Sequence, residues 1–131
     1  MKVSLGTDLD GLTERVIGAA FAVHGALGHG FAEAVCTKAL LRELADDGLQ
    51  ASTEVPFKVH YKDEPVGCYF ADLVVEQRVI VELKTCEALI QAHSRQVLNY
   101  LRASGLPVGL LRNFASPSLT VRRVLPPARH P

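Results

Sequence analysis

Three charged residues interrupt apolar segments near the middle of the sequence. Asp72 lies within Phe70–Val75, and Glu82 and Lys84 lie in and directly after Val79–Leu83. Burying an unpaired charge costs several kcal/mol, so charges in such segments are usually paired, exposed at a strand end or bound to a metal. Two carboxylates beside an ammonium suit phosphodiester cleavage, because carboxylates hold hard divalent cations that activate water and neutralise phosphate charge. For a Glu-x-Lys pattern alone, a surface ion pair at a hairpin is the competing interpretation.

The length of the loop between the two segments decides whether the three side chains meet. Side chains alternate across a strand, so Glu82 and Lys84 project from one face. Opposed residues of an antiparallel pair share a face, so a three-residue loop, either 75–77 or 76–78, brings Asp72 to that same face. A two-residue loop would send it to the other face. We therefore predict a three-residue or bulged turn with Gln77 or Arg78 in the left-handed region, at a cost of about 1 kcal/mol.

Further polar side chains recur at helical spacing after this hairpin. His93, Gln96 and Tyr100 are separated by three and four residues, which places them on one helical face. An ordinary polar face is the alternative explanation for these three residues. Glu33 falls in the first turn of an earlier predicted helix, where the helix dipole alone favours a carboxylate.

Hydrophobic periodicity predicts the elements that position these side chains. Helices are expected at Leu12–Leu27, from about Phe31 to Leu44 with a stop at Gly48, and at about Ala88–Ala103; strands are expected at Thr53–Tyr61, Val66–Val75, Val79–Leu83, Pro107–Leu111 and Leu119–Leu125. The continuous apolar run Val79–Leu83 is typical of a central strand covered on both faces.

Size and composition fit one soluble globular domain. The chain has 131 residues, of which 48% are hydrophobic and 21% charged, and it lacks an apolar run of the roughly 18 residues that span a bilayer. The N-terminus has no apolar centre of a signal peptide, so a cytoplasmic location is expected. Residues 1–9 and 126–131 are predicted to be flexible.

Charge and cysteine content restrict the kinds of site that can be expected. The formal net charge is zero, so any contact with nucleic acid must be local. The three cysteines are widely spaced and form no zinc-binding pattern, which predicts reduced, mostly buried thiols.

Together these residues resemble a known protein family. The segment 30–36, Gly-Phe-Ala-Glu-Ala-Val-Cys, is similar to the signature of the GxxExxY family. The similarity continues through residues 12–14, 23–24, 71–73 and 79–84, then through His93, residues 96–101, 109–111 and 113–114. That family is placed in the PD-(D/E)XK nuclease superfamily.

The resemblance implies an α/β fold of restriction-endonuclease type, with an αβββαβ core in which helices flank a mixed central sheet. It also implies a catalytic centre in which a helix glutamate joins a strand aspartate and a Glu-x-Lys strand. Glu33, Asp72, Glu82 and Lys84 match these in order, and Asp72, Glu82 and Glu33 would hold Mg²⁺ or Mn²⁺. Gln96 and Tyr100 resemble the QxxxY motif of RecB-type exonucleases, whose residues help position substrate, with His93 nearby.

Three positions differ from the family pattern or match it less fully. Cys36 stands where the family has tyrosine, so that phenol is absent or replaced. His29 lies between Gly25 and Glu33 at the GxxxHxxxE spacing of RecB-type motifs, which makes it a secondary metal-ligand candidate. His24 matches the family and is a further secondary metal-ligand candidate, although a core or loop-stabilising histidine is the usual role for such a residue.

The resemblance predicts a single-domain Mg²⁺- or Mn²⁺-dependent nuclease that acts on DNA rather than RNA, with exonuclease or single-strand activity. One alternative is a non-catalytic module that keeps the fold and binds nucleic acid or protein. Another is a junction-resolving endonuclease that works as a homodimer. No association with a membrane is expected.

Overall fold

The computed structural model describes residues 7–115 and 117–126. The elements in chain order are α1 (Thr7–Leu27), α2 (Glu33–Asp46), β1 (Ala51–Tyr61), β2 (Glu64–Val75), β3 (Val79–Lys84), α3 (Gln91–Ser104), β4 (Val108–Asn113) and β5 (Thr120–Val124). The flexibility expected of residues 1–6 and 127–131 concerns residues outside this description. Residues 7–9, also expected to be flexible, instead form the first turn of α1, where Asp8 forms an ion pair with Arg78.

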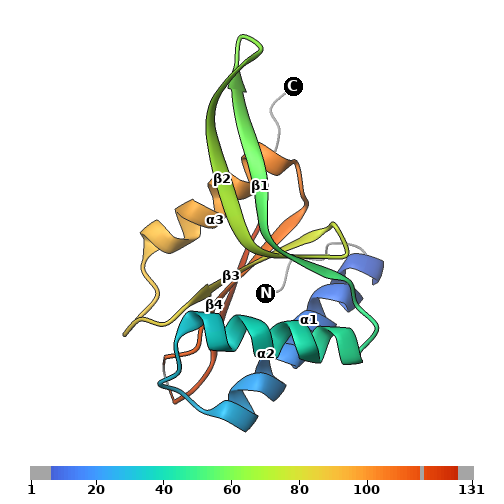
Figure 1. Cartoon of the computed structure of the whole chain (residues 1–131), viewed down its shortest axis with the longest axis vertical. Helices are drawn as coiled ribbons and strands as arrows, with labels where there is room; N and C mark the ends of the chain where they lie inside the picture. The colour runs from blue at the N-terminus through green and yellow to red at the C-terminus, as the bar shows by residue number, and fades with distance from the viewer. Residues whose placement is uncertain (1–6, 116, 127–131) are drawn as a thin grey trace.

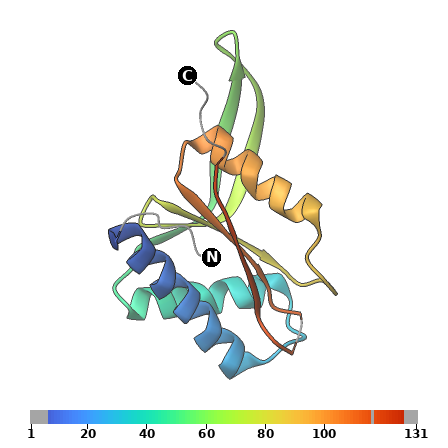
Figure 2. The same cartoon turned by 180° about the vertical axis from the view of Figure 1, so that it is seen from behind.

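A five-stranded sheet runs in the order β1-β2-β3-β4-β5. Only β3 and β4 pair in parallel, because α3 connects them, while the other three pairs are antiparallel. Helices α1 and α2 cover one face and α3 covers the other (Figures 1 and 2). This arrangement confirms the predicted mixed sheet flanked by helices.

Strand alternation divides the core into two layers. Leu73, Val81 and Leu83 pack with α1 and α2, whereas Val74, Ile80 and Leu111 pack with α3. A Cβ atom at Gly109 would collide with Val97, so a glycine at this position of β4 lets α3 approach the sheet. β3 is buried along nearly its whole length, as predicted for the central strand.

The β2–β3 connection is the three-residue turn that was predicted. Val75 pairs with Val79, which leaves Glu76, Gln77 and Arg78 in the loop. Gln77 has a φ of 57°, as expected for one of the two named residues, and Glu76, which was not predicted to be left-handed, has a φ of 52°. The Arg78 amide donates a hydrogen bond to the Val75 carbonyl over 3.0 Å, which closes the turn.

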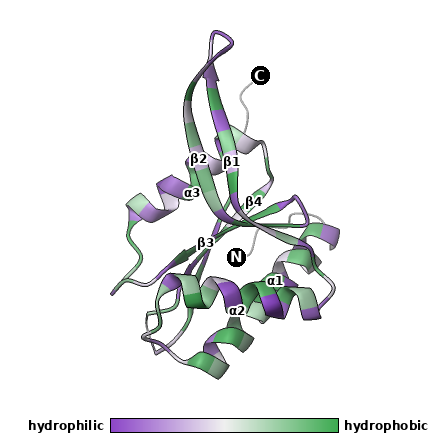
Figure 3. Ribbon diagram, in the orientation of Figure 1, coloured by the Kyte–Doolittle hydropathy of each residue, from purple (hydrophilic) through white to green (hydrophobic). Residues whose placement is uncertain are grey.

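The β1–β2 hairpin is longer than its sequence pattern indicated. Its turn contains only Lys62 and Asp63, both with positive φ, so the strands extend to Tyr61 and Glu64. Figure 3 shows polar residues gathered at the tip of this hairpin and hydrophobic residues concentrated in the central strands. α2 begins at Glu33 and α3 at Gln91, each slightly later than expected. No helix in the described part of the chain is long and apolar enough to cross a membrane.

Candidate active site

Asp72 and Glu82 are joined by two hydrogen bonds at the point where β2 leaves β3. The Asp72 amide donates to Glu82 Oε1 over 2.9 Å, and the Leu83 amide donates to Asp72 Oδ2 over 3.0 Å. Each carboxylate therefore accepts a backbone hydrogen bond from the neighbouring strand. The register that pairs Leu73 with Val81 places Asp72 next to Glu82, as the three-residue loop requires.

The two side chains meet here because β2 changes partners along its length. Its ladder with β3 contains only three pairs, from Val75–Val79 to Leu73–Val81, whereas its ladder with β1 continues to the end of the hairpin. Where β2 and β3 separate, the β2–β3 ladder no longer pairs the amides of Asp72 and Leu83. The Glu82 and Asp72 carboxylates accept hydrogen bonds from these amides instead. The site is consequently located at a fork in the sheet.

Lys84 completes the group on β3. Its Nζ lies 3.8 Å from Glu82 Oε2, and alternation along the strand gives both side chains the same direction. Glu82 is almost fully buried, and this burial raises its pKa to about 8. The Asp72 charge adds to the rise, while the hydrogen bond from the Asp72 amide and the Lys84 charge oppose it.

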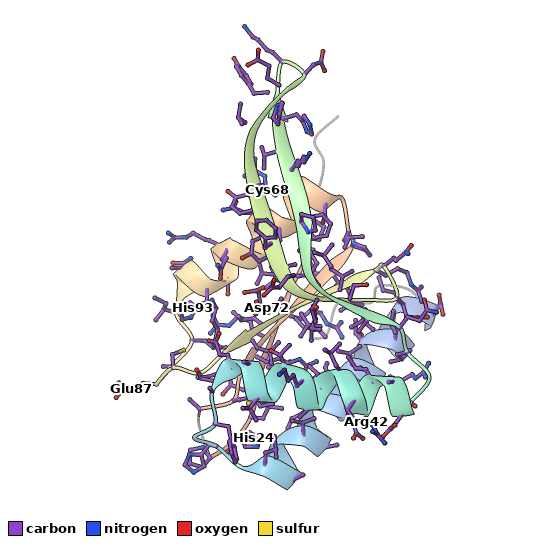
Figure 4. All side chains as sticks on the ribbon, in the orientation of Figure 1. His24, Arg42, Cys68, Asp72, Glu87 and His93 are labelled. Atoms are coloured by element: carbon purple, nitrogen blue, oxygen red, sulfur yellow. The ribbon has the colours of Figure 1, made fainter. Side chains whose placement is uncertain are left out.

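A surface hollow of about 360 Å³ opens beside Asp72, between α2 and the start of the β1–β2 hairpin. Glu33, the first residue of α2, lines it together with Asp72 and Glu54. Figure 4 shows Asp72 at the foot of the hairpin, between α3 and α2. Glu33 and Asp72 thus line the same hollow.

Glu54 is a residue at this hollow that sequence reasoning missed. The β1–β2 register places it opposite Asp72, at the one position between Thr53–Leu73 and Val55–Ala71 where no ladder pair forms. Its φ of 48° is rare for a strand residue other than glycine. In the sequence, Glu54 is visible only as a carboxylate within the alternating pattern of β1. Its unusual backbone conformation depends on the pairing between β1 and β2, which the sequence does not reveal.

Tyr100 on α3 lies close enough to the carboxylates to be influenced by their charges, and Gln96 forms a hydrogen bond with it. Burial raises the pKa of Tyr100 to about 12, and the charges of Glu82 and Asp72 add to this shift. A hydrogen bond between the Tyr100 and Gln96 side chains acts in the opposite direction. The Tyr69 ring lies 5.5 Å from the Tyr100 ring, measured between centroids, so β2 and α3 enclose the phenol.

The histidines occupy less central positions. His93 Nδ1 accepts a hydrogen bond of 3.1 Å from the Ile90 amide, so this ring caps the start of α3. His24 packs against Phe114 at a centroid distance of 6.1 Å, in keeping with a core role, and His29 is exposed between α1 and α2. Cys36 is buried in the α1–α2 layer, and burial raises the pKa of its thiol.

The predicted cluster of three metal-binding carboxylates is only partly assembled. Asp72 and Glu82 are adjacent, but within residues 7–115 and 117–126 no three His, Cys, Asp or Glu side chains gather closely enough to hold a metal ion. Glu33, the first residue of α2, is exposed on the wall of the hollow and does not join Asp72 and Glu82 in such a group. His24 and His29 likewise join no such group.

Comparison with known proteins identifies the family. A model described as the PD-(D/E)XK nuclease superfamily matches residues 10–124. The chain belongs to the PD-(D/E)XK nuclease superfamily. The segment Glu82-Leu83-Lys84 has the (D/E)XK form that appears in the superfamily's name.

A comparison with solved structures shows a similar fold. A protein described as SSO0001 matches with a TM-score of 0.56 and 19% sequence identity, over 89% of this chain and 58% of that chain. The chain therefore spans little more than half the length of that relative. No curated protein matches the sequence.

Proposed function

We propose that this PD-(D/E)XK protein is a GxxExxY-type nuclease that hydrolyses phosphodiester bonds in DNA with the help of Mg²⁺ or Mn²⁺. Asp72, Glu82 and Lys84 would form its catalytic centre, with Glu33 beside them. The observation that carries the proposal is the paired hydrogen bonding of Asp72 and Glu82 at the fork of the sheet. This pairing brings two carboxylates and the Lys84 ammonium to one point beside a surface hollow.

The residues fit a hard divalent cation. Carboxylate oxygens are the ligands that Mg²⁺ and Mn²⁺ prefer, and Asp72 and Glu82 would hold the ion, with Glu33 as a further carboxylate from α2. A nearby cation would also favour the ionised form of Glu82, which burial disfavours. When bound, such an ion neutralises charge on the phosphate and lowers the pKa of water.

The protein groups have separate parts in this proposal. Lys84 would place a positive charge where negative charge develops on the phosphate oxygens, and its position near Glu82 holds it at the centre. Tyr100, supported by Gln96, would position the substrate or the carboxylates, in the manner of the RecB-type motif. With its pKa raised to about 12, the Tyr100 phenol stays protonated at neutral pH and can donate a hydrogen bond.

A nuclease assay tests the proposal directly. Purified protein is incubated with single-stranded, duplex and branched DNA and with RNA, in Mg²⁺, in Mn²⁺ and in chelator. We expect cleavage of DNA, strongest on single strands or from ends, that requires the added ion.

Variants tie this activity to the site. Asp72→Asn, Glu82→Gln and Lys84→Ala should each abolish cleavage, while Asp46→Asn should not. Asp46 is a suitable control because it is an exposed carboxylate at the C-terminal end of α2. Its ion pair with Arg42 is also exposed and therefore contributes little to stability. Undiminished cleavage by Glu82→Gln would reject the site, and binding of DNA without cleavage under every condition would favour the non-catalytic module.

A further inference from the structure

The distal part of the β1–β2 hairpin, residues 56–70, forms an arm whose base packs against α3 and whose tip stands clear of the helices (Figures 1 and 2). Its strands β1 and β2 have 11 and 12 residues, about twice the usual length of a strand. Every residue from Glu64 to Phe70 is exposed. Because a two-stranded hairpin gains little stability by itself in water, packing does not account for the length of the arm.

The arm carries several large apolar side chains that are exposed. Among the described residues, eight large hydrophobic side chains are exposed, and four of them lie on the arm: Tyr61, Val66, Tyr69 and Phe70. Phe70 is 59% exposed and lies two positions before Asp72. Exposed apolar groups gathered beside a candidate site indicate a surface that binds something.

The two faces of the arm have different surroundings. Tyr69 faces α3, where its ring packs beside that of Tyr100. Since side chains alternate along a strand, Phe70 projects from the opposite face. Cross-strand pairing adds Lys58 to that face, because Lys58 lies opposite Cys68. His60 is two positions further along β1, just past an irregularity in the register, and is exposed like Lys58.

The face that carries Phe70 leads to the hollow beside the catalytic carboxylates. Phe70 and Pro56 are cross-strand partners at the base of the arm. Asp72 and Glu54, each two residues closer to the central sheet on the same two strands, line the hollow. Cys68 and Asp72, labelled in Figure 4, mark this path along β2. A chain of nucleotides that entered the hollow would therefore pass the Phe70 ring.

We propose that Phe70, Lys58 and His60 form a platform on which a base of single-stranded nucleic acid stacks while the strand reaches Asp72 and Glu82. The inference rests on the proposed nuclease function and adds the class of substrate and the surface that selects it. Aromatic rings beside cationic groups bind single strands independently of sequence, because every base has a face that can stack.

Charge favours a single strand over a duplex as the occupant. Proteins that grip duplex DNA through its phosphates make on the order of 6–10 cationic contacts. This chain has no net charge, and the platform supplies one lysine and one histidine. Stacking on Phe70 must therefore contribute a large part of the affinity, and a base is free to stack only where it is unpaired.

The absence of tryptophan from the sequence gives a direct test. Phe70→Trp introduces a single indole at the platform, and Glu82→Gln in the same protein prevents cleavage during the titration. We expect a single-stranded DNA oligonucleotide to quench the indole emission, whereas an abasic oligonucleotide of equal length and charge leaves it unchanged. Phe21→Trp, at a similarly exposed position on α1, is the matched control and should not be quenched by either.

Affinity measurements complete the test. In the Glu82→Gln background, Phe70→Ala should weaken binding of single-stranded DNA by about tenfold or more and change the weak binding of blunt duplex much less. Equal quenching by the base-containing and abasic strands, or unchanged affinity in Phe70→Ala, would overturn the platform. A dimer in sedimentation that Phe70→Ala dissociates would also overturn it, because the arm would then be a contact between two copies.

These results separate the platform from the proposed function. If the wild-type protein cleaves nothing but Phe70→Trp is quenched by single-stranded DNA, the nuclease proposal fails and the platform stands. If the protein cleaves DNA with a KM that Phe70→Ala leaves unchanged, the nuclease proposal stands and the platform fails.

Discussion

Asp72 and Glu82 each complete the hydrogen bonding of the other's strand: Glu82 accepts from the Asp72 amide, and Asp72 accepts from the Leu83 amide. The same two carboxylates are the proposed ligands of a divalent cation. Their position is therefore held by backbone contacts that do not depend on the ion. This dual role predicts that structural and catalytic effects of substitutions can be separated.

Asp72→Asn and Asp72→Ala should differ in stability but not in activity. The asparagine amide oxygen can still accept from the Leu83 amide, so Asp72→Asn should unfold at nearly the wild-type urea concentration. Alanine leaves that amide without its acceptor, which costs about 1–3 kcal/mol of unfolding free energy. Both variants should lose at least about 100-fold in cleavage rate, since the anionic ligand is gone. Equal stability of the two variants would show that the hydrogen bond to Leu83 contributes nothing.

The stability of the metal-free protein should depend on pH through Glu82. Below about pH 4.5 Glu82 is protonated in both the folded and unfolded states, and above that pH only the folded state keeps the proton, because its pKa is raised to about 8. The unfolded state then binds fewer protons than the folded state, so stability falls as the pH rises from about 4.5 to 8 and levels off above it.

Urea unfolding in chelator, measured between pH 5 and 8.5, checks this dependence. The stability of the wild type relative to Glu82→Gln should decrease as the pH rises, because glutamine does not titrate. Added Mg²⁺ or Mn²⁺ should restore the stability of the wild type at the upper end of this pH range. Parallel curves for the two proteins in chelator would contradict the assigned burial of the Glu82 charge.

The turn that places Asp72 next to Glu82 was predictable because the alternation of side chains along a strand is a local property. The loop between two apolar runs had to contain an odd number of residues for Asp72 to face Glu82, and Val75–Val79 pairing confirms this. Gln96 and Tyr100 were likewise located by the helical repeat, which needs no knowledge of the remaining fold. In each case the relevant distance in sequence is short.

Features that depend on distant contacts were missed. The positive φ of Glu54 arises where β1 bends opposite Asp72, 18 residues away in a register that the sequence does not reveal. Periodicity also indicated strands in the hairpin without indicating that every residue from Glu64 to Phe70 would be exposed. The partial separation of Glu33 from the other carboxylates depends on how α2 sits over the sheet, which is a property of the assembled core.

We expect the charge of Glu54 to contribute to activity and its positive φ to lower the unfolding free energy. Glu54→Gln keeps the backbone conformation and removes the carboxylate, so we expect cleavage to fall about 10- to 100-fold, as for residues that support metal ligands, with unchanged stability. Glu54→Asn should gain up to about 1 kcal/mol in unfolding free energy, since asparagine tolerates the left-handed region. Wild-type activity in Glu54→Gln would show that Glu54 only lines the hollow.

Arg112 should be a source of instability. It is fully buried in β4, and none of its three guanidinium nitrogens has a hydrogen-bond partner within the described part of the chain. Burial lowers its pKa to about 9, so the side chain remains mostly charged at neutral pH. An enclosed charge without a partner opposes folding, and replacing buried charges by well-packed apolar groups often stabilises proteins by about 1–4 kcal/mol.

Arg112→Met therefore should raise the unfolding free energy by an amount in that range, because methionine is unbranched, flexible and able to fill the space of the arginine stem. Chemical denaturation at pH 7 measures the change, and Arg42→Met, at an exposed ion pair on α2, should shift stability by less than about 1 kcal/mol. The nuclease rate of Arg112→Met should equal that of the wild type, because Arg112 lies outside the hollow that Asp72 and Glu33 line. A loss of stability in Arg112→Met would contradict this, because it would mean that the guanidinium makes a favourable contact in the folded protein.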